Sequence, residues 1–409
     1  MKVLHLWKSN VARAGGGGAV AMSRLHAGLQ AAGIDSKVLC EIKTNNSIDI
    51  IKTNAPNRWE KRIRLATSRL GLNDIHRISS FRLNQHPVYQ DADVITIHGT
   101  HHGFINYLAL PRLTRNKPTA FVLHDMWALT GHCAVSFGCE RWVHGCGKCP
   151  HLDAPPVVQR DSTWLEWKLK NWAYSRSRLT IISPSNVLTE QAKQSMLSRF
   201  NVFHVPHGLD TAVFRPIDTL KARSLLGIPP NKKVLMFTSV DINSFGKGVD
   251  LLFTALKNLP NSLKDELILM TLGQVSNELS MITDVPTHNL GYIEDDQLKV
   301  QAYSAADLFV SPTRGEAFGL SILESIACGT PVVAFGVGGV LDLVRPGITG
   351  YVAKPENAED LCRGIVQLLV NEDLRRSMSE TGLKVVQQEY TLDLQVKRYI
   401  DLYQEMLTN

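Results

Sequence analysis

Glu316 and Glu324 are the side chains of this sequence best placed to do chemistry on a polar ligand. They lie in SPTRGEAFGLSILESIACGTPVVAF, residues 311–335. This stretch reads as a strand end, a loop that carries Glu316, and a helix that carries Glu324 in its second turn. The two carboxylates can therefore reach two separate groups of one ligand, and neutral hydroxyl groups are the expected partners.

The start of the same helix is a candidate phosphate site. The backbone amides of Phe318, Gly319 and Leu320 lack partners within the helix and carry the positive end of its dipole. Phosphate oxygens bind well at such a helix end. The stretch therefore favours a ligand that carries both phosphate and hydroxyl groups.

The glutamate spacing, the AFGL segment and the SIACGTPVVAF continuation resemble the signature of retaining GT-B glycosyltransferases of family four. The resemblance covers essentially the whole chain. It includes the glycine run at 15–18, SPS at 183–185, HVPHGLD at 204–210, KGVDLLFTAL from Lys247 and GYIEDDQL from Gly291. HDMWALTGHC and the cysteines after it resemble the colanic-acid and capsular polysaccharide subset.

The resemblance implies a role for each matching residue. Glu316 contacts the transferred hexose, Glu324 holds the ribose hydroxyls, and Lys247 neutralises the donor diphosphate as it leaves. Tyr292 and Ile293 match the segment that frames the base. No catalytic metal is expected, because the helix start and basic side chains take its place at the diphosphate.

The sequence departs from the family at one place. Family members usually carry Gly-Arg before the lysine, whereas TSVDINSFGKG has no arginine between Thr238 and Lys247. Either Lys247 and the helix start suffice, or Arg314 or another cation takes the role.

In the first half, four glycines follow the first predicted strand without the Lys-Ser or Lys-Thr of a Walker loop. Glycines let the backbone approach a ligand closely, and a helix is expected from Ala19. The resemblance places this loop, through Gly16 and Gly17, beside the donor diphosphate and the acceptor. The alternative is a flexible turn.

Two histidines end predicted strands of the first half. His124 ends AFVLH and matches the family's histidine beside the transferred sugar, and Asp125 follows it. His98 ends DVITIH in the same way. Ligands of open α/β sheets bind beyond the carboxyl ends of the strands, so we expect His98 and Asp125 on the acceptor side.

Apolar strand-like runs alternate with helical stretches along the chain, which predicts an α/β fold with two doubly wound parallel sheets. The resemblance makes this the GT-B architecture, two Rossmann-like domains facing across a cleft. We expect an N-terminal acceptor-side domain over 1–205 with a cysteine-rich insert at 132–151, and a hinge at 206–216. We expect a nucleotide-sugar domain over 217–388. The chain should end in a closing helix at 389–409 that packs back on the N-terminal domain.

Charge is distributed unevenly. Residues 1–205 carry 26 Lys plus Arg against 13 Asp plus Glu, whereas the remainder carries 18 against 25. Basic amphipathic stretches at 57–70 and 164–178 can lie on an anionic membrane surface, receive a lipid-pyrophosphate acceptor, or be ordinary core helices with solvated basic edges. No nucleic-acid module is recognisable. The opening segment reads as a buried strand, so we expect a cytoplasmic protein, peripheral on the inner face of the plasma membrane.

Four cysteines, Cys133, Cys139, Cys146 and Cys149, fall within seventeen residues, and three histidines lie nearby. The Cys-x2-Cys end is typical of zinc knuckles, whereas the first gap is wider than usual. A structural zinc site, two disulfides and free thiols remain open. In each case the cluster braces the loop after His124.

The sequence thus predicts a hexosyltransferase that uses a UDP- or GDP-linked sugar and a glycan or lipid-linked oligosaccharide acceptor in surface polysaccharide synthesis. A sugar-nucleotide epimerase or glycan phosphorylase on the same fold is one alternative. A non-catalytic, zinc-stapled binding or scaffold protein is another.

Overall fold

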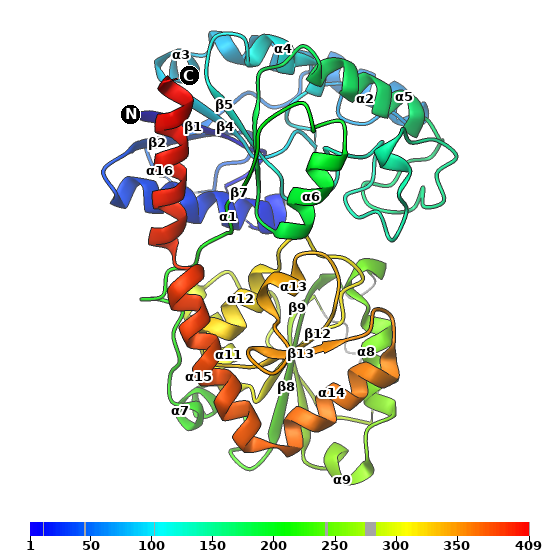
Figure 1. The fold of residues 1–409 in the computed structure, drawn as a ribbon, viewed down its shortest axis with the longest axis vertical. Coiled ribbons are helices and arrows are strands. Elements are labelled where there is room, and N and C mark those ends of the chain that lie inside the picture. The colour runs from blue at the N-terminus through cyan, green and yellow to red at the C-terminus, as the bar shows by residue number, and fades with distance from the viewer. Residues whose placement is uncertain (11, 45, 102, 242–243, 275–283, 409) are drawn as a thin grey trace. The chain divides into compact units, whose positions relative to one another are not determined.

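The computed structural model describes residues 1–10, 12–44, 46–101, 103–241, 244–274 and 284–408, and the chain divides into two compact units (Figure 1). Unit 1 comprises Met1–Gly208 together with Leu392–Asn409, and unit 2 comprises Leu209–Thr391. The division falls within the predicted hinge, most of which belongs to unit 2.

Unit 1 contains a seven-stranded parallel sheet in the order β3-β2-β1-β4-β5-β6-β7. The strands are β1 Lys2–Leu6, β2 Asp35–Cys40, β3 Ile50–Lys52, β4 Val94–Ile97, β5 Thr119–Val122, β6 Thr180–Ser183 and β7 Val202–His204. The central strands β4 and β5 are buried at every position, as continuous apolar runs predict for strands covered on both faces.

Helices cover this sheet. They are α1 Ala12–Ala31, α2 Arg58–Arg69, α3 Pro87–Asp91, α4 Leu110–Leu113, α5 Thr163–Tyr174, α6 Asn186–Gln194 and α16 Leu392–Thr408, with 3-10 turns η1 Ile78–Gln85, η2 Tyr107–Ala109 and η3 Arg141–Val143. The last helix, α16, crosses α1 in Figure 1, contacts it, and contributes Val396, Tyr399 and Tyr403 to the core of unit 1. A side chain at Gly28 of α1 would collide with Val396, so glycine permits this close packing.

Unit 2 contains a six-stranded parallel sheet in the order β10-β9-β8-β11-β12-β13. The strands are β8 Lys233–Asp241, β9 Leu267–Gln274, β10 Thr287–Asn289, β11 Leu308–Ser311, β12 Val332–Phe335 and β13 Gly350–Ala353. Relative to the first strand of each unit, both sheets follow the 3-2-1-4-5-6 order of nucleotide-binding folds.

Two layers of helices enclose the second sheet (Figure 1). The helices are α7 Thr219–Leu226, α8 Val249–Lys257, α9 Asn261–Lys264, α11 Asp296–Ala305, α12 Leu320–Ala327, α13 Val340–Leu343, α14 Ala358–Val370 and α15 Glu372–Glu389, with the 3-10 turn η4 Phe245–Lys247. Helices α7, α11 and α12 build one core against the sheet, and α8, α9 and α14 build the other. No helix of the described residues is both long and apolar enough to cross a bilayer.

The structure confirms the predicted fold of two doubly wound parallel units. The four strands that the sequence did not reveal, β3, β7, β10 and β13, are the edge strands of the two sheets. Each is three or four residues long and carries partly exposed positions. Edge strands therefore lack the continuous apolar run that marks a central strand.

Candidate active site

In each sheet the strand order reverses between the first and fourth strands of the unit, the place where such folds bind their ligands. In unit 2 this point lies between β8 and β11. Lys247 ends the turn η4 after β8, and Glu316 lies in the loop after β11. The topology therefore brings together two residues that are 69 positions apart in the sequence.

The Nζ atom of Lys247 lies 3.3 Å from Oε2 of Glu316. The Lys247 side chain is 43% exposed and that of Glu316 is 27% exposed. Neither group is withdrawn into the core, so both remain accessible to a ligand. The pair combines a cation suited to phosphate with a carboxylate suited to hydroxyl groups.

Gly248 fixes the distance between the two loops. Its backbone is left-handed, with φ of 63°, and a Cβ atom there would lie 1.9 Å from the carbonyl oxygen of Pro312. Only glycine satisfies both conditions. The Lys247 turn therefore lies backbone to backbone against the loop that carries Glu316.

Arg314 binds the same two loops together. Its guanidinium donates two hydrogen bonds to Asp250, of 2.9 and 2.6 Å, and one to the carbonyl of Phe245. The charge and hydrogen bonds of Asp250 raise the pKa of Arg314, and only 5% of the side chain is exposed. These contacts position the two loops, and the expectation that Arg314 replaces the missing family arginine stays a prediction.

Helix α12 begins directly after Gly319, whose φ of 102° and ψ of 63° favour glycine. Glu324 is buried, and Oε2 accepts a 3.1 Å hydrogen bond from the hydroxyl of Tyr303. The side chain of Phe318 packs into the core, so Phe318 offers a ligand its backbone only. Leu320 is half-buried and contributes the first helical amide.

Tyr292 and Ile293 follow β10 in a loop that starts at Gly291. Both side chains are half-buried, and Ile293 packs against the core of unit 2. The amide of Gly273, at the end of β9, donates to the carbonyl of Gly291. This bond holds the loop at the same edge of the sheet as the other candidates.

In unit 1 the equivalent edge carries a row of histidines. His98 directly follows β4, and its Nδ1 lies 3.1 Å from Nε2 of His124. Its Nε2 lies 2.9 Å from Nδ1 of His5 on β1. His207 stacks on the far side of His124 at 5.4 Å between ring centroids.

His5, His98 and His207 are buried and His124 is half-buried, and the loss of solvent keeps these rings neutral. Desolvation lowers the pKa of His124 to about 4 and that of His5 to about 3. The pKa values of His98 and His207 lie well below the ordinary value for the same reason. At neutral pH His124 is therefore a hydrogen-bonding group and not a cation.

Asp125 has a local task beside this row. Oδ2 lies 3.0 Å from Nε2 of His101, and Oδ1 accepts the amide of Trp127. Burial opposes a charge on His101, but the charge and hydrogen bond of Asp125 outweigh it and raise the pKa of His101. Asp125 thus holds the HDMW turn in place, and an acceptor-side contact remains a prediction.

The glycine run differs from its expectation. It lies inside α1, which begins at Ala12 rather than at Ala19, and Gly16 breaks the helical geometry with φ of 63° and ψ of −161°. Gly16 and Gly17 are exposed. A Cβ at Gly18 would lie 3.1 Å from Trp7 and 3.2 Å from His124, so this glycine lets the helix pack over the histidine.

Cys133, Cys139, Cys146 and Cys149 line one cavity of about 20 Å³, together with His132 and His151. All seven cysteines of the chain are free, so the alternative of two disulfides is not formed. In the part of the chain that the structure describes, no three Cys, His, Asp or Glu side chains are arranged to hold a metal ion. The thiols thus share a cavity of single-atom size without forming a coordination sphere.

The sequence did not identify His5, His101 or His207 as partners of the strand-end histidines. One signal was present for His5, since a histidine at a buried position interrupts the apolar strand KVLHL. His101 and His207 lie in irregular segments, and only the fold shows that they reach the same edge.

Comparison with known proteins agrees with this arrangement. The family model described as Glycosyltransferase Family 4 matches residues 15–213, and the model described as Glycosyl transferases group 1 matches residues 220–385. A D-inositol 3-phosphate glycosyltransferase from Corynebacterium aurimucosum is 32% identical over 66% of this chain and 64% of the relative. Another, from Catenulispora acidiphila, is 33% identical over 44% of this chain and 46% of the relative. The chain spans about half the length of most of these curated relatives.

Several solved structures share the fold. Sucrose-phosphate synthase from Thermosynechococcus elongatus superposes with a TM-score of 0.71 at 18% identity over 100% of both chains. WaaG, a glycosyltransferase involved in lipopolysaccharide biosynthesis, gives 0.69 at 18% identity over 98% of this chain and 99% of its own. Anabaena HepE in complex with UDP gives 0.67 at 17% identity over 99% of this chain and 100% of its own. The fold is therefore GT-B, and with both family models matched the chain belongs to the group 1, family 4 type of glycosyltransferases.

Proposed function

We propose that the chain is a retaining glycosyltransferase that moves a hexose from a nucleotide diphosphate sugar to a hydroxyl group of a glycan or lipid-linked oligosaccharide in surface polysaccharide synthesis. The observation that carries the proposal is the Lys247–Glu316 pair, 3.3 Å apart at the switch point of unit 2. Glu324 and the start of α12 lie on the next element of the same unit.

In the proposed reaction the bond between the sugar and the diphosphate breaks, and the acceptor hydroxyl oxygen bonds to the same sugar carbon from the same face. The leaving phosphate oxygen gains charge and takes up the proton of that hydroxyl group. Lys247 and the first amides of α12 stabilise that charge without a bound metal ion. Glu316 orients the sugar hydroxyls and does not act as the nucleophile. Glu324, held by Tyr303, binds the ribose hydroxyls.

In unit 1 the neutral His124 donates a hydrogen bond to the transferred sugar. Solved relatives of the same fold support a UDP-sugar as donor, since HepE has been solved in complex with UDP, with UDP and glucose, and with UDP-glucose. WaaG, described as acting in lipopolysaccharide biosynthesis, supports a surface glycan as the product.

Glu316→Gln and Lys247→Met test the proposal. Removing one group that stabilises developing charge typically slows turnover by about 10²–10³-fold. The matched controls are Glu359→Gln and Lys257→Met, which change exposed groups on α14 and α8. Transfer is measured as nucleotide diphosphate release from UDP- and GDP-sugars with lipid extract as acceptor source. Equal rates in all four variants would remove the pair from the site.

The same assay separates the alternatives. An epimerase converts the donor without any acceptor, and a phosphorylase requires inorganic phosphate or a pyridoxal cofactor. A scaffold leaves every donor intact. Product that forms only when donor and acceptor are both present supports transfer.

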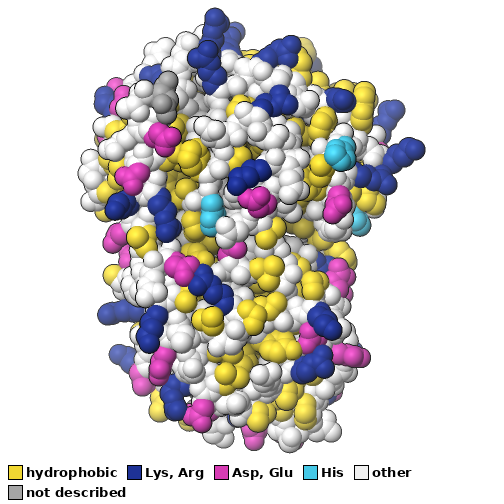
Figure 2. Space-filling view, viewed as in Figure 1, with side chains coloured by type: hydrophobic (Ala, Val, Ile, Leu, Met, Phe, Trp, Pro, Cys, Tyr) yellow, Lys and Arg dark blue, Asp and Glu magenta, His cyan; other side chains and the backbone are white. Residues whose placement is uncertain are grey.

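We also propose that unit 1 binds an anionic membrane surface through α2 and α5. Trp59, Trp164 and Trp172 are 69%, 57% and 47% exposed, and each has a Lys or Arg side chain over its ring at 4.7–5.8 Å. The hydroxyl of Ser162, beside α5, donates to the carbonyl of Leu70 at the end of α2 and so joins the two helices. Figure 2 shows hydrophobic and basic side chains intermixed over this part of unit 1. Exposed Trp with basic neighbours is typical of interfacial helices.

The four clustered cysteines are proposed to take up one Zn²⁺ as a structural brace. Thiolates are the ligands that zinc prefers, and all four thiols already border one small cavity. Binding requires the side chains to move toward the ion, since they do not form its coordination sphere as they stand.

A further inference from the structure

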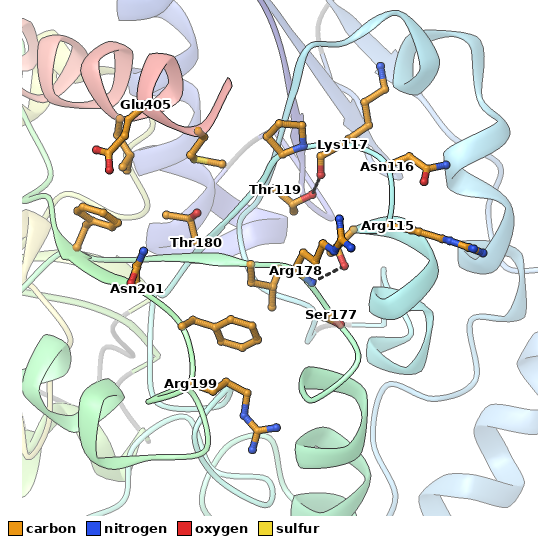
Figure 3. A pocket seen from close by; sticks show the side chains of 17 residues that line it. Arg115, Asn116, Lys117, Thr119, Ser177, Arg178, Thr180, Arg199, Asn201 and Glu405 are labelled. Carbon is orange, nitrogen blue, oxygen red and sulfur yellow. Dashed lines mark hydrogen bonds between the residues drawn. The ribbon is translucent and has the colours of Figure 1, made fainter. Parts of the chain in front are cut away.

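A groove of unit 1 lies at the opposite edge of the sheet from the histidines. Its lining comes from the segments that precede β5, β6 and β7 and from the last turns of α16, and its volume is about 730 Å³ (Figure 3). Because His98 and His124 follow the carboxyl ends of their strands, this groove at the amino ends is separate from the candidate active site.

Charge in the groove is strongly positive. Four cations line it, Arg115, Lys117, Arg178 and Arg199, whereas Glu405 is the one acid among the described lining residues. Figure 3 shows Arg115, Lys117 and Arg178 on the same side of the groove, away from Glu405. A concentration of cations in a hollow attracts an anionic ligand.

Two of the cations have no competing partner. In the described part of the chain, the guanidinium groups of Arg115 and Arg178 form no hydrogen bond or ion pair, and both side chains are exposed. Arg199 is held by Asn171, and Lys117 is held by the carbonyls of Gln90 and Ala92. The groove therefore offers two anchored and two available cations.

The loops that carry these cations are tied together. The hydroxyl of Thr114 accepts the amide of Arg178 at 2.9 Å, and the hydroxyl of Thr119 donates to the carbonyl of Lys117 at 2.9 Å (Figure 3). Arg115 thus lies in a segment fixed at both ends. A site fixed in advance loses less conformational entropy when a ligand binds.

Apolar side chains complete the groove. Phe200, Phe203 and Met406 are half-buried, and each turns its remaining surface to the hollow. A soluble sugar phosphate has no apolar part that could contact these side chains. A phosphate head group attached to acyl chains matches both the cations and the apolar side chains of the groove. The groove also adjoins α5, because Arg199 contacts Asn171 on that helix.

We propose that this groove binds the phosphate head group of an anionic phospholipid. The proposal extends the membrane association proposed for α2 and α5 and needs no sugar nucleotide, so its test is independent of transfer.

The test is binding of the full chain to vesicles of phosphatidylcholine alone or with phosphatidylglycerol, at one salt concentration. Each cation near an anionic surface contributes about a five-fold gain in affinity, so Arg115→Gln with Arg178→Gln should lose at least about tenfold on phosphatidylglycerol vesicles. Binding to phosphatidylcholine should not change. Trp59→Ser with Trp164→Ser should instead weaken binding to both kinds of vesicle.

The matched control is Arg82→Gln with Lys384→Gln, which removes the same charge from exposed positions elsewhere. An equal loss in this control, or no loss in the groove variant, overturns the proposal. Inorganic phosphate at millimolar concentration should not displace the protein from the vesicles. Displacement by phosphate that is absent with chloride at equal ionic strength would assign the groove to a soluble anion instead.

Discussion

The Nδ1 atom of His98 lies 3.1 Å from Nε2 of His124, and the same imidazole reaches back to His5 at 2.9 Å. A neutral imidazole has one donor and one acceptor, so three rings in a row must orient their protons in one direction. Nε2 of His5 is buried with no hydrogen-bond partner among the described residues, and a bare acceptor costs less there than an unpaired N–H. The protons therefore lie on Nδ1 of each ring, which leaves Nδ1–H of His124 as the donor for a ligand.

This arrangement predicts that His98 is a positioning residue for His124. His98→Leu removes the donor to Nε2 and should lower kcat about fivefold with KM little changed, because one hydrogen bond contributes about 1 kcal/mol. His98→Asn, which keeps an N–H, should retain more activity. The ¹⁵N shifts of His124 report the tautomer directly. An unchanged tautomer in His98→Leu, or a KM effect alone, would reduce His98 to a packing residue.

The buried histidines also predict acid lability. Their pKa values in the fold, about 3 for His5 and about 4 for His124, lie below the 6.5 of the unfolded chain because burial disfavours the charged ring. Between these values the unfolded state binds more protons, so stability rises with pH and falls as pH decreases from about 6.5. His124 alone should cost roughly 2 kcal/mol at pH 5. Melting curves from pH 7.5 to 4.5 test this, and His124→Gln should flatten the profile. A melting temperature independent of pH would contradict the buried neutral state.

Arg314 and Asp250 give a test that separates positioning from ligand binding. If Arg314 only anchors the Lys247 turn, Asp250→Asn and Arg314→Lys should both weaken donor binding, since each removes the paired hydrogen bonds. If Arg314 instead neutralises the diphosphate, Asp250→Asn frees its charge and should tighten binding. We expect weaker binding in both variants, measured by calorimetry with UDP and GDP. Tighter binding in Asp250→Asn would restore Arg314 to the phosphate site.

Gly248 and Gly227 allow a controlled test of the contact between the Lys247 turn and the loop that carries Glu316. Both have left-handed backbones, with φ of 63° and 68°, but only at Gly248 does a Cβ meet the carbonyl of Pro312, whereas Gly227 has nothing within 4 Å. Gly227→Ala should cost about 1 kcal/mol for the backbone conformation alone. Gly248→Ala should cost clearly more and should also lower activity. If Gly248→Ala and Gly227→Ala shift the midpoint of urea unfolding equally, the close contact between Gly248 and Pro312 does not contribute to stability.

The sequence revealed the fold and the candidate site residues to different degrees for physical reasons. Continuous apolar runs identified the central strands, because those are covered on both faces, and left the short edge strands undetected. Motif spacing found Glu316 and Lys247, and strand-end position found His98 and His124. Their partners were not visible, since the contacts of Arg314 with Asp250 and of His98 with His5 join residues more than sixty positions apart. The role of Gly18 in the glycine run was not visible either, because a side chain at Gly18 would crowd the ring of His124, which is distant in the sequence.

The cysteine cluster carries the remaining prediction. If the shared cavity takes up Zn²⁺, protein purified with reductant and without chelator should contain about one zinc per chain. Cys146→Ser and Cys149→Ser should lose the metal, whereas Cys362→Ser, in the core of unit 2, should keep it. Because metal binding contributes to folding free energy, a chelator should lower the melting temperature of the wild type and leave that of Cys146→Ser unchanged. Metal-free protein whose melting temperature does not change with chelator would show that packed thiols alone form the brace. One such contact is that of Cys146 with the amide of Gly131.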